Sequence, residues 1–107
     1  MQVNNYLGTI TIEKAVYLAL TKAAVNNIEG IRFIDSMFSI LFNNRIKVEN
    51  QNERPNITVE VEVDYGLHLP TKGREIQKSV HAILTKLLNI QLADINVYFR
   101  KVAVSAG

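Results

Sequence analysis

The segment from Ile57 to Asn89 joins a strictly alternating stretch to a helically periodic one, and few folds accommodate that pair. Between residues 57 and 65 apolar side chains alternate with polar ones; the apolar set is Ile57, Val59, Val61, Val63 and Tyr65. A period of two predicts a strand with one buried and one solvated face. The pattern breaks at Gly66 and Pro70. A helical stripe then follows, made of Ile76, Val80, Ile83, Leu84, Leu87 and Leu88.

The N-terminal part of the chain predicts a short strand and a first helix. Residues 1–6 are polar and are expected to be loose, whereas residues 8–12 predict a short extended segment. The helix is expected to begin near Glu13, because an acidic residue suits the positive end of a helix dipole. Gly30 is expected to end it. Its inner stripe is predicted to consist of Ile12, Val16, Ala19, Leu20 and Ala23.

The middle of the chain predicts two short strands that precede the long one. Residues 31–35 predict the first strand, residues 36–42 a helical turn over one edge of the core, and residues 43–44 a turn. Arg45 to Glu49 predicts the second strand, and the polar residues 50–56 predict a hairpin loop. Antiparallel pairing would place four charged residues on one outer face: Arg45, Lys47, Glu60 and Glu62. Such a charge run is typically a solvated face.

The C-terminal part predicts the end of the second helix and a last strand. Asn89 is a suitable left-handed helix stop, and residues 95–100 alternate apolar with polar side chains. Residues 103–107 are expected to trail off. The resulting order is strand, helix, strand, strand, long strand, helix, strand. We predict an α+β fold, a two-layer sandwich with two helices packed on one face of a mostly antiparallel sheet. All of residues 1–107 are expected to form one domain.

Composition narrows the class of function. The net charge is +2, and residues 1–54 and 55–107 each carry 6 basic and 5 acidic side chains. This balance is too even for a dedicated nucleic-acid binder. The absence of cysteine excludes disulfides, thiolate metal sites and cysteine nucleophiles. Neither a signal pattern nor a transmembrane run of about 20 apolar residues is present. A cytoplasmic location follows as the expectation, with any membrane contact made through a partner.

No catalytic or metal-binding grouping stands out among the polar residues. His68 and His81 lack tight ligand spacing with Asp64 or Glu75. The serines have no motif around them, and the carboxylates of the long strand all fall on its wet face. We therefore expect no enzyme, no metal site and no cofactor. An enzyme or a lipid carrier would need a sizeable apolar pocket, which a sequence does not display.

Two surfaces are candidates for binding. On the outer sheet face, Tyr98 and Arg100 are the predicted protein-contact residues, because Tyr and Arg are favoured interface anchors; Arg45 and Lys47 accompany them. The alternative is a small RNA-binding module that uses a basic stripe on the second helix, formed by Arg74, Lys78 and His81. Tyr65 and Gly66 are assigned to structure: Gly66 permits a sharp turn and Tyr65 is expected to cap the core.

Several segments together resemble the bacterial alkaline-shock-protein and Gls-type general-stress-protein family. They are Gly8-Thr9-Ile10-Thr11-Ile12, Ile28-Glu29-Gly30-Ile31, VEVDYGLHLP at 61–70, Ile76-Gln77 with Val80, and Ile95-Asn96-Val97-Tyr98. They cover nearly the whole chain in the family's order. Asn89 and Lys101 stand where glycines are usual, and the segment between Gly30 and Arg45 is short. The chain is therefore similar to a divergent or minimal member.

The resemblance implies a non-enzymatic protein linked to envelope and alkaline stress. Family members self-associate or dock to a separate, membrane-anchored partner, and the family offers no catalytic residues to carry over. The function expected here is a small interaction module. Its expected partner is a second copy or another protein, including a membrane-anchored one, rather than nucleic acid.

Overall fold

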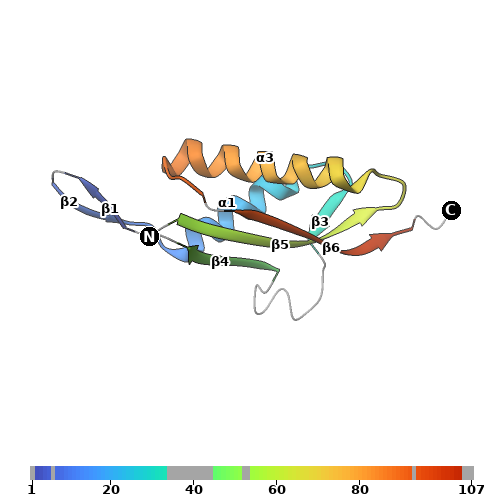
Figure 1. The fold of residues 1–107 in the computed structure, drawn as a ribbon, viewed down its shortest axis with the longest axis horizontal. Helices are drawn as coiled ribbons and strands as arrows, with labels where there is room; N and C mark the ends of the chain where they lie inside the picture. The colour runs from blue at the N-terminus through green and yellow to red at the C-terminus, as the bar shows by residue number, and fades with distance from the viewer. Residues whose placement is uncertain (1, 6, 34–44, 52–53, 93, 105–107) are drawn as a thin grey trace.

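The computed structural model describes residues 2–5, 7–33, 45–51, 54–92 and 94–104. The elements run in the predicted order with one strand added at the start (Figure 1). They are β1 (Gln2–Asn5), β2 (Gly8–Thr11), α1 (Lys14–Asn26), β3 (Ile31–Phe33), β4 (Ile46–Gln51), β5 (Arg54–Asp64), α3 (Leu69–Leu88) and β6 (Ile95–Ala103). The α+β class is confirmed. The helical turn predicted over 36–42 and the turn at 43–44 lie outside the described residues.

Strand β5 is the centre of the main sheet. It pairs antiparallel with β3 and β4, and parallel with β6. Ile57 has partners on both β4 and β6, and Val63 has partners on both β3 and β6. Strands β3 and β4 therefore share one edge of β5, and β6 occupies the other. The sheet is mostly antiparallel, as predicted.

The predicted alternation of β5 is confirmed by burial. The side chains of Ile57, Val59, Val61 and Val63 are fully buried. They form one core with residues of α1 and α3, so both helices pack on the same apolar face of the sheet (Figure 1). Burying a Val, Ile or Leu side chain is worth roughly 1.5–3 kcal/mol, which makes this face the main source of stability.

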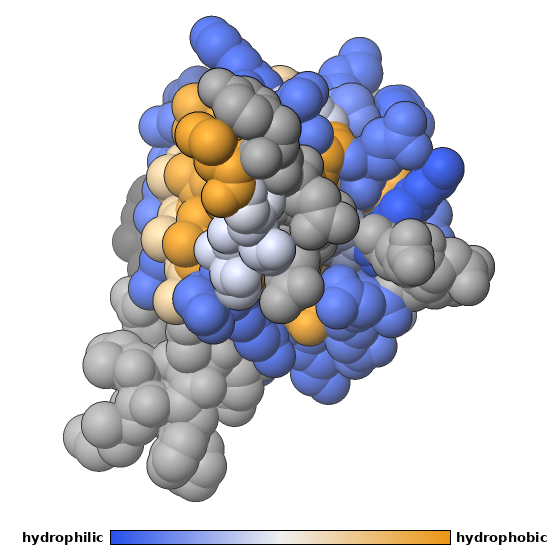
Figure 2. Space-filling view, turned by 90° about the vertical axis from the view of Figure 1, so that its left-hand side faces the viewer, coloured by the Kyte–Doolittle hydropathy of each residue, from blue (hydrophilic) through white to orange (hydrophobic). Residues whose placement is uncertain are grey.

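The predicted inner stripe of α1 is wrong at three of its five positions, whereas Ile12 and Leu20 are partly buried against the core. Val16, Ala19 and Ala23 are exposed, and the buried residues are instead Tyr17, Thr21, Ala24 and Val25. Because the helix is apolar on most of its circumference, two stripes rotated by one residue fit helical spacing equally well. Exposed apolar surface is visible at the end of the molecule where β1 and β2 lie (Figure 2).

Two further predictions about the core are corrected. Leu87, placed on the inner stripe of α3, is 62 % exposed, whereas Ile76, Val80 and Leu84 of the same stripe are fully buried. Leu87 lies in the last turn of the helix, at the border of the buried stripe. Tyr65 does not cap the core, since it is 73 % exposed. It follows the last residue of β5, where the chain has already left the covered part of the sheet.

The polar segment 50–56 is strand rather than loop over most of its length. Asn50 pairs with Pro55 and Gln51 pairs with Arg54 in the β4–β5 ladder. Pro55 is buried. A proline is tolerated near the beginning of a strand, where losing one ladder donor costs little. The polar residues and the proline predicted a loop here, but backbone pairing with β4 holds the segment in a strand.

The turn into α3 and the end of that helix are fixed by particular residues. Gly66 has a φ of 96°, so it makes the predicted corner in a backbone region that favours glycine. The Nδ1 of His68 accepts a hydrogen bond from the Thr71 amide at 3.3 Å and caps the helix start. Asn89 ends the helix in the left-handed conformation, with φ 51° and ψ 48°, which confirms its predicted role.

The first residues of the chain are not loose. Residues 2–5 form β1, which pairs antiparallel with β2 in a separate two-stranded sheet. This hairpin extends away from the rest of the described chain (Figure 1). The polar composition of residues 2–5 concealed it, because a hairpin that faces solvent needs no buried face.

Tyr17 gives the fold a pH dependence that can be measured. Its ring is buried in the core, and burial raises the pKa of its phenol. The folded chain therefore keeps the phenolic proton to a higher pH than the unfolded chain. Above about pH 10, the ordinary tyrosine pKa, the unfolded state releases that proton first, so the free energy of unfolding falls as pH rises.

Tyr17→Phe should lose this contribution. We expect the free energy of unfolding of the native chain, measured by urea titration, to fall relative to that of Tyr17→Phe as pH rises above about 10. Tyr65→Phe controls for removing a hydroxyl at an exposed position. A constant difference between the native chain and Tyr17→Phe across this pH range would contradict the expectation.

Candidate protein-interaction face

The side of the main sheet that points away from the helices carries a network of paired charges, here called the outer face. Glu60 on β5 lies between two arginines, with Arg45 Nη1 at 3.2 Å and Arg100 Nε at 3.1 Å from its two oxygens. Its neighbour Glu62 lies between Arg32 Nε at 3.1 Å and Lys101 Nζ at 3.4 Å. Arg45 therefore shares the outer face with Glu60, as predicted from antiparallel pairing.

The charges form columns that follow the strands. On one side of β5 stand two basic residues, Arg45 just before β4 and Arg32 on β3. The acidic residues stand on β5 itself, and basic residues stand again on β6, on the other side. Arg32 also binds Asp64, with its Nη1 2.9 Å from Oδ1. Each partly exposed pair is worth about 0.2–1 kcal/mol. Their main effect is to hold the long side chains in fixed positions and to leave little net charge on the face.

A bulge in β6 brings Lys101 into this network beside Arg100. Val61 pairs with Phe99, and the next pair is Glu62 with Lys101, so Arg100 is the extra residue of the bulge. The bulge lets two successive basic residues of β6 each reach an acid on β5, which strict alternation would not permit. Sequence periodicity cannot reveal it, because Arg100 continues the alternation of residues 95–100 without a break.

All four residues predicted for protein contact lie around one shallow hollow of about 240 Å³ on the outer face. The residues that line it are Arg45, Lys47, Glu49, Thr58, Glu60, Tyr98 and Arg100. Lys47 stands opposite Thr58 in the β4–β5 ladder. Sequence reasoning did not assign Glu49 and Thr58 to this place. Thr58 could have been found from strand parity, since it alternates with Glu60.

Tyr98 and Arg100 form an ordered pair of side chains at the hollow. Tyr98 is 47 % exposed, and the guanidinium carbon of Arg100 lies 4.8 Å from the centre of its ring. This cation–π contact and the bond from Arg100 to Glu60 fix both side chains before any partner arrives. A preordered pair of this kind loses little conformational entropy on binding.

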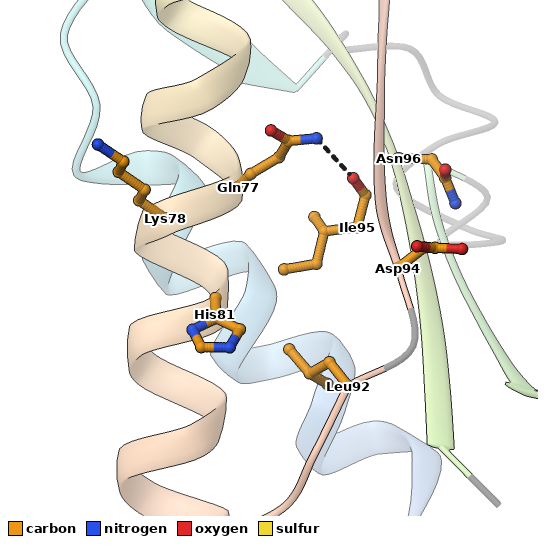
Figure 3. Close-up of a pocket in the computed structure, with 7 residues that line it drawn as sticks. All are labelled: Gln77, Lys78, His81, Leu92, Asp94, Ile95 and Asn96. Atoms are coloured by element: carbon orange, nitrogen blue, oxygen red, sulfur yellow. Dashed lines mark hydrogen bonds between the residues drawn. The ribbon is translucent and has the colours of Figure 1, made fainter.

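The alternative stripe on α3 also exists as an exposed surface. Arg74, Lys78 and His81 are all exposed, at spacings that place them on one side of the helix. Lys78 and His81 line a second hollow of about 560 Å³, which sequence reasoning missed (Figure 3). The other lining residues are Gln77, Leu92, Asp94, Ile95 and Asn96. The hollow depends on how α3 lies against β6, which no local pattern encodes.

The described residues contain neither a metal-binding cluster nor a membrane-spanning helix. Among the residues with defined positions, no three His, Asp or Glu side chains are grouped as a metal site would require. Neither helix within the ranges given above has the length and apolarity needed to cross a membrane.

Comparison with known proteins agrees with the resemblance drawn from the sequence. A sequence model of the alkaline-shock-protein family, described as having a cell envelope-related function, matches residues 2–104 of the 107. Searches of curated proteins and of solved structures give no match.

Proposed function

We propose that this chain, which belongs to the alkaline-shock-protein family of cell envelope-related function, acts as a binding module that docks through its outer face. Its partner would be a second copy of the chain or another protein of the envelope, and a membrane-anchored partner would hold it at the periphery of the membrane. The observation that carries the proposal is the exposed Tyr98–Arg100 pair, ordered beside the hollow on a face whose other charges are largely paired.

The arrangement of charges supports contact with a second copy. The acidic column on β5 has a basic column on each side. Each basic column lies on a neighbouring strand, and neighbouring strands are about 4.8 Å apart. If a second outer face were laid on the first and shifted by one strand, acidic residues would meet basic ones. Tyr and Arg near the centre of such a contact are the residue types that contribute most binding energy.

The double change Tyr98→Ala with Arg100→Ala tests the outer face. Both side chains are about half exposed, so the melting temperature should change little. Self-association, measured by sedimentation equilibrium of the full chain, should weaken by about tenfold or more, since a hot-spot residue contributes about 2 kcal/mol and 1.4 kcal/mol is tenfold. The matched control is Arg74→Ala with Lys78→Ala on α3, which should leave self-association unchanged.

The same variants test the case of a different protein partner. If the native chain is monomeric, the interaction is measured with envelope proteins recovered from its own cells by tagged pull-down. Association that survives the outer-face change would overturn the assignment of the site. RNA that co-elutes and is lost with the α3 control variant would favour the nucleic-acid alternative.

A further inference from the structure

Strand β6 leaves one edge of the main sheet open. Its pairing with β5 uses one side of the strand, and no other strand in the described part of the chain pairs with the opposite side. An unpaired edge presents backbone N–H and C=O groups that can accept a further strand. The open edge lies beside α3, so that strand and helix together bound the second hollow (Figure 3).

The hydrogen bonds identify which groups of β6 face outward. The Ile57 amide donates to the carbonyl of Asp94 at 2.9 Å, so that carbonyl points toward β5. Because successive carbonyls of a strand point to opposite edges, the carbonyl of Ile95 points away from β5, and Val97 and Phe99 follow the same parity up to the bulge. The side-chain amide of Gln77 confirms this direction, since it donates to the Ile95 carbonyl from α3 at 3.0 Å.

Helix and strand run in opposite directions along the hollow. Gln77 contacts Ile95, whereas a Cβ added to Gly73 would lie 3.7 Å from the ring of Phe99. The open groups of Val97 and Phe99 therefore lie alongside the part of α3 between Gly73 and Gln77, which carries Arg74. A peptide that paired with this edge of β6 would run alongside the exposed side of α3 that carries residues 74 to 81.

The hollow has room for a side chain, and the side of α3 that borders it carries basic residues. Leu92 and Ile95 point toward α3 at its base, and Gln77 reaches from the helix to the Ile95 carbonyl (Figure 3). His81 lines the hollow one turn further along α3. Arg74 and Lys78 are exposed on the same side of α3, and neither forms an ion pair with another described residue. The Lys78 amine points away from β6, so it lies at the outer border of the hollow rather than at its base (Figure 3). Asp94 is the acidic residue of the lining, and it points away from α3 (Figure 3). This side of α3 is therefore suited to acidic side chains.

From these observations we infer that the groove between α3 and the open edge of β6 receives an extended acidic peptide of another protein. The peptide adds to β6 as a further strand. Backbone hydrogen bonds to Val97 and Phe99 supply affinity, an apolar side chain contacts Leu92 and Ile95, and acidic side chains lie near Arg74 and Lys78. Edge strand, flanking helix and side-chain pocket are the parts that strand-addition recognition uses. This site uses the backbone edge of β6, whereas the outer-face site uses the side chains of Tyr98 and Arg100 on the same strand.

The test uses a random peptide library displayed on phage and panned against the full chain. We expect the selected peptides to alternate β-branched apolar residues with acidic ones. A selected peptide is then synthesised and its Kd measured by fluorescence anisotropy. Arg74→Glu with Lys78→Glu, at exposed positions of α3, should weaken binding by about tenfold. The matched charge reversal Lys14→Glu with Lys22→Glu, at exposed positions of α1, should leave it unchanged.

Two measurements report on the strand geometry without changing the protein. Methyl groups on alternate backbone nitrogens of the peptide should abolish binding in one register and leave it intact in the other, because a strand presents every second amide to its neighbour. Hydrogen exchange at the amides of Val97 and Phe99 should slow when the peptide binds. Failure to select any peptide, equal effects of both methylation patterns, or exchange unchanged at these amides would overturn the proposal. Tighter binding of a single-stranded RNA, lost in the α3 variant, would do the same.

Discussion

Val59→Asp is expected to abolish folding of this chain. Val59 is fully buried at the middle of β5, under both helices, and its surroundings in the core are apolar. A carboxylate there has no partner, and the effective penalty for an unpaired buried ion is several kcal/mol. Losing the packed valine adds a further cost. Because a domain of this size is stable by only about 5–15 kcal/mol, the sum approaches or exceeds the whole stability.

Thr58→Asp is the matched control, since it introduces the same residue one position away on the other face. Thr58 lies opposite Lys47 on the outer face. Thr58 is partly exposed and accepts a hydrogen bond from the Asn96 side chain at 3.4 Å, so the change should lower the free energy of unfolding by about 1 kcal/mol, the span of strand propensities, and leave the fold intact. Far-UV circular dichroism with urea titration distinguishes the two variants: a cooperative transition should remain for Thr58→Asp and be absent for Val59→Asp. Similar transitions in both would contradict the assigned faces of β5.

The alternation of β5 was predictable because each residue of that strand has only two possible directions. A strand of this length with one polar and one apolar face leaves a single register. The outer-face residues follow from the same parity, and the structure places Arg45, Lys47, Tyr98 and Arg100 around one hollow. To predict these four residues, it was enough to assume that neighbouring strands of a sheet share a face.

Two features of the candidate site lay beyond such reasoning. The parallel pairing of β6 with β5 and its bulge at Arg100 decide which acid each basic residue reaches. Both depend on the path of the chain between the end of α3 and β6, and therefore on tertiary packing. The groove beside β6 has the same origin, because Gln77 and Ile95 are 18 residues apart and meet only when helix and strand are docked.

The first helix shows a different limit of sequence reasoning. In α1, alanines and apolar residues occupy most positions, so hydrophobic spacing does not select one face. Contacts with α3 and the sheet select it, and they bury Tyr17 and Ala24 rather than Val16 and Ala23. The second helix is better determined because most of its charged residues occupy the exposed side and leave one apolar stripe. Only the border of that stripe was misplaced.

Leu84 and Leu87 test where that border lies. Both belong to the stripe predicted from spacing, both are leucines of α3, and they are one turn apart. Leu84 is fully buried within the core, whereas Leu87 is 62 % exposed. Leu84→Ala should lower the free energy of unfolding by about 2–5 kcal/mol, because it removes buried methyl groups and leaves a cavity. Leu87→Ala should change it by less than about 0.5 kcal/mol.

The comparison is sharp because the two changes have the same effect on intrinsic helix propensity. Leucine and alanine are both strong helix formers, so propensity shifts each variant equally and slightly in favour of the helix. Any large difference between them therefore reports burial alone. Urea titrations of the two variants at a protein concentration that keeps both monomeric would measure it. If the two changes cost the same, α3 would have to be rotated on the sheet so that Leu87 also faces β5. That rotation would turn Gln77 away from the Ile95 carbonyl and remove the groove from which peptide binding was inferred.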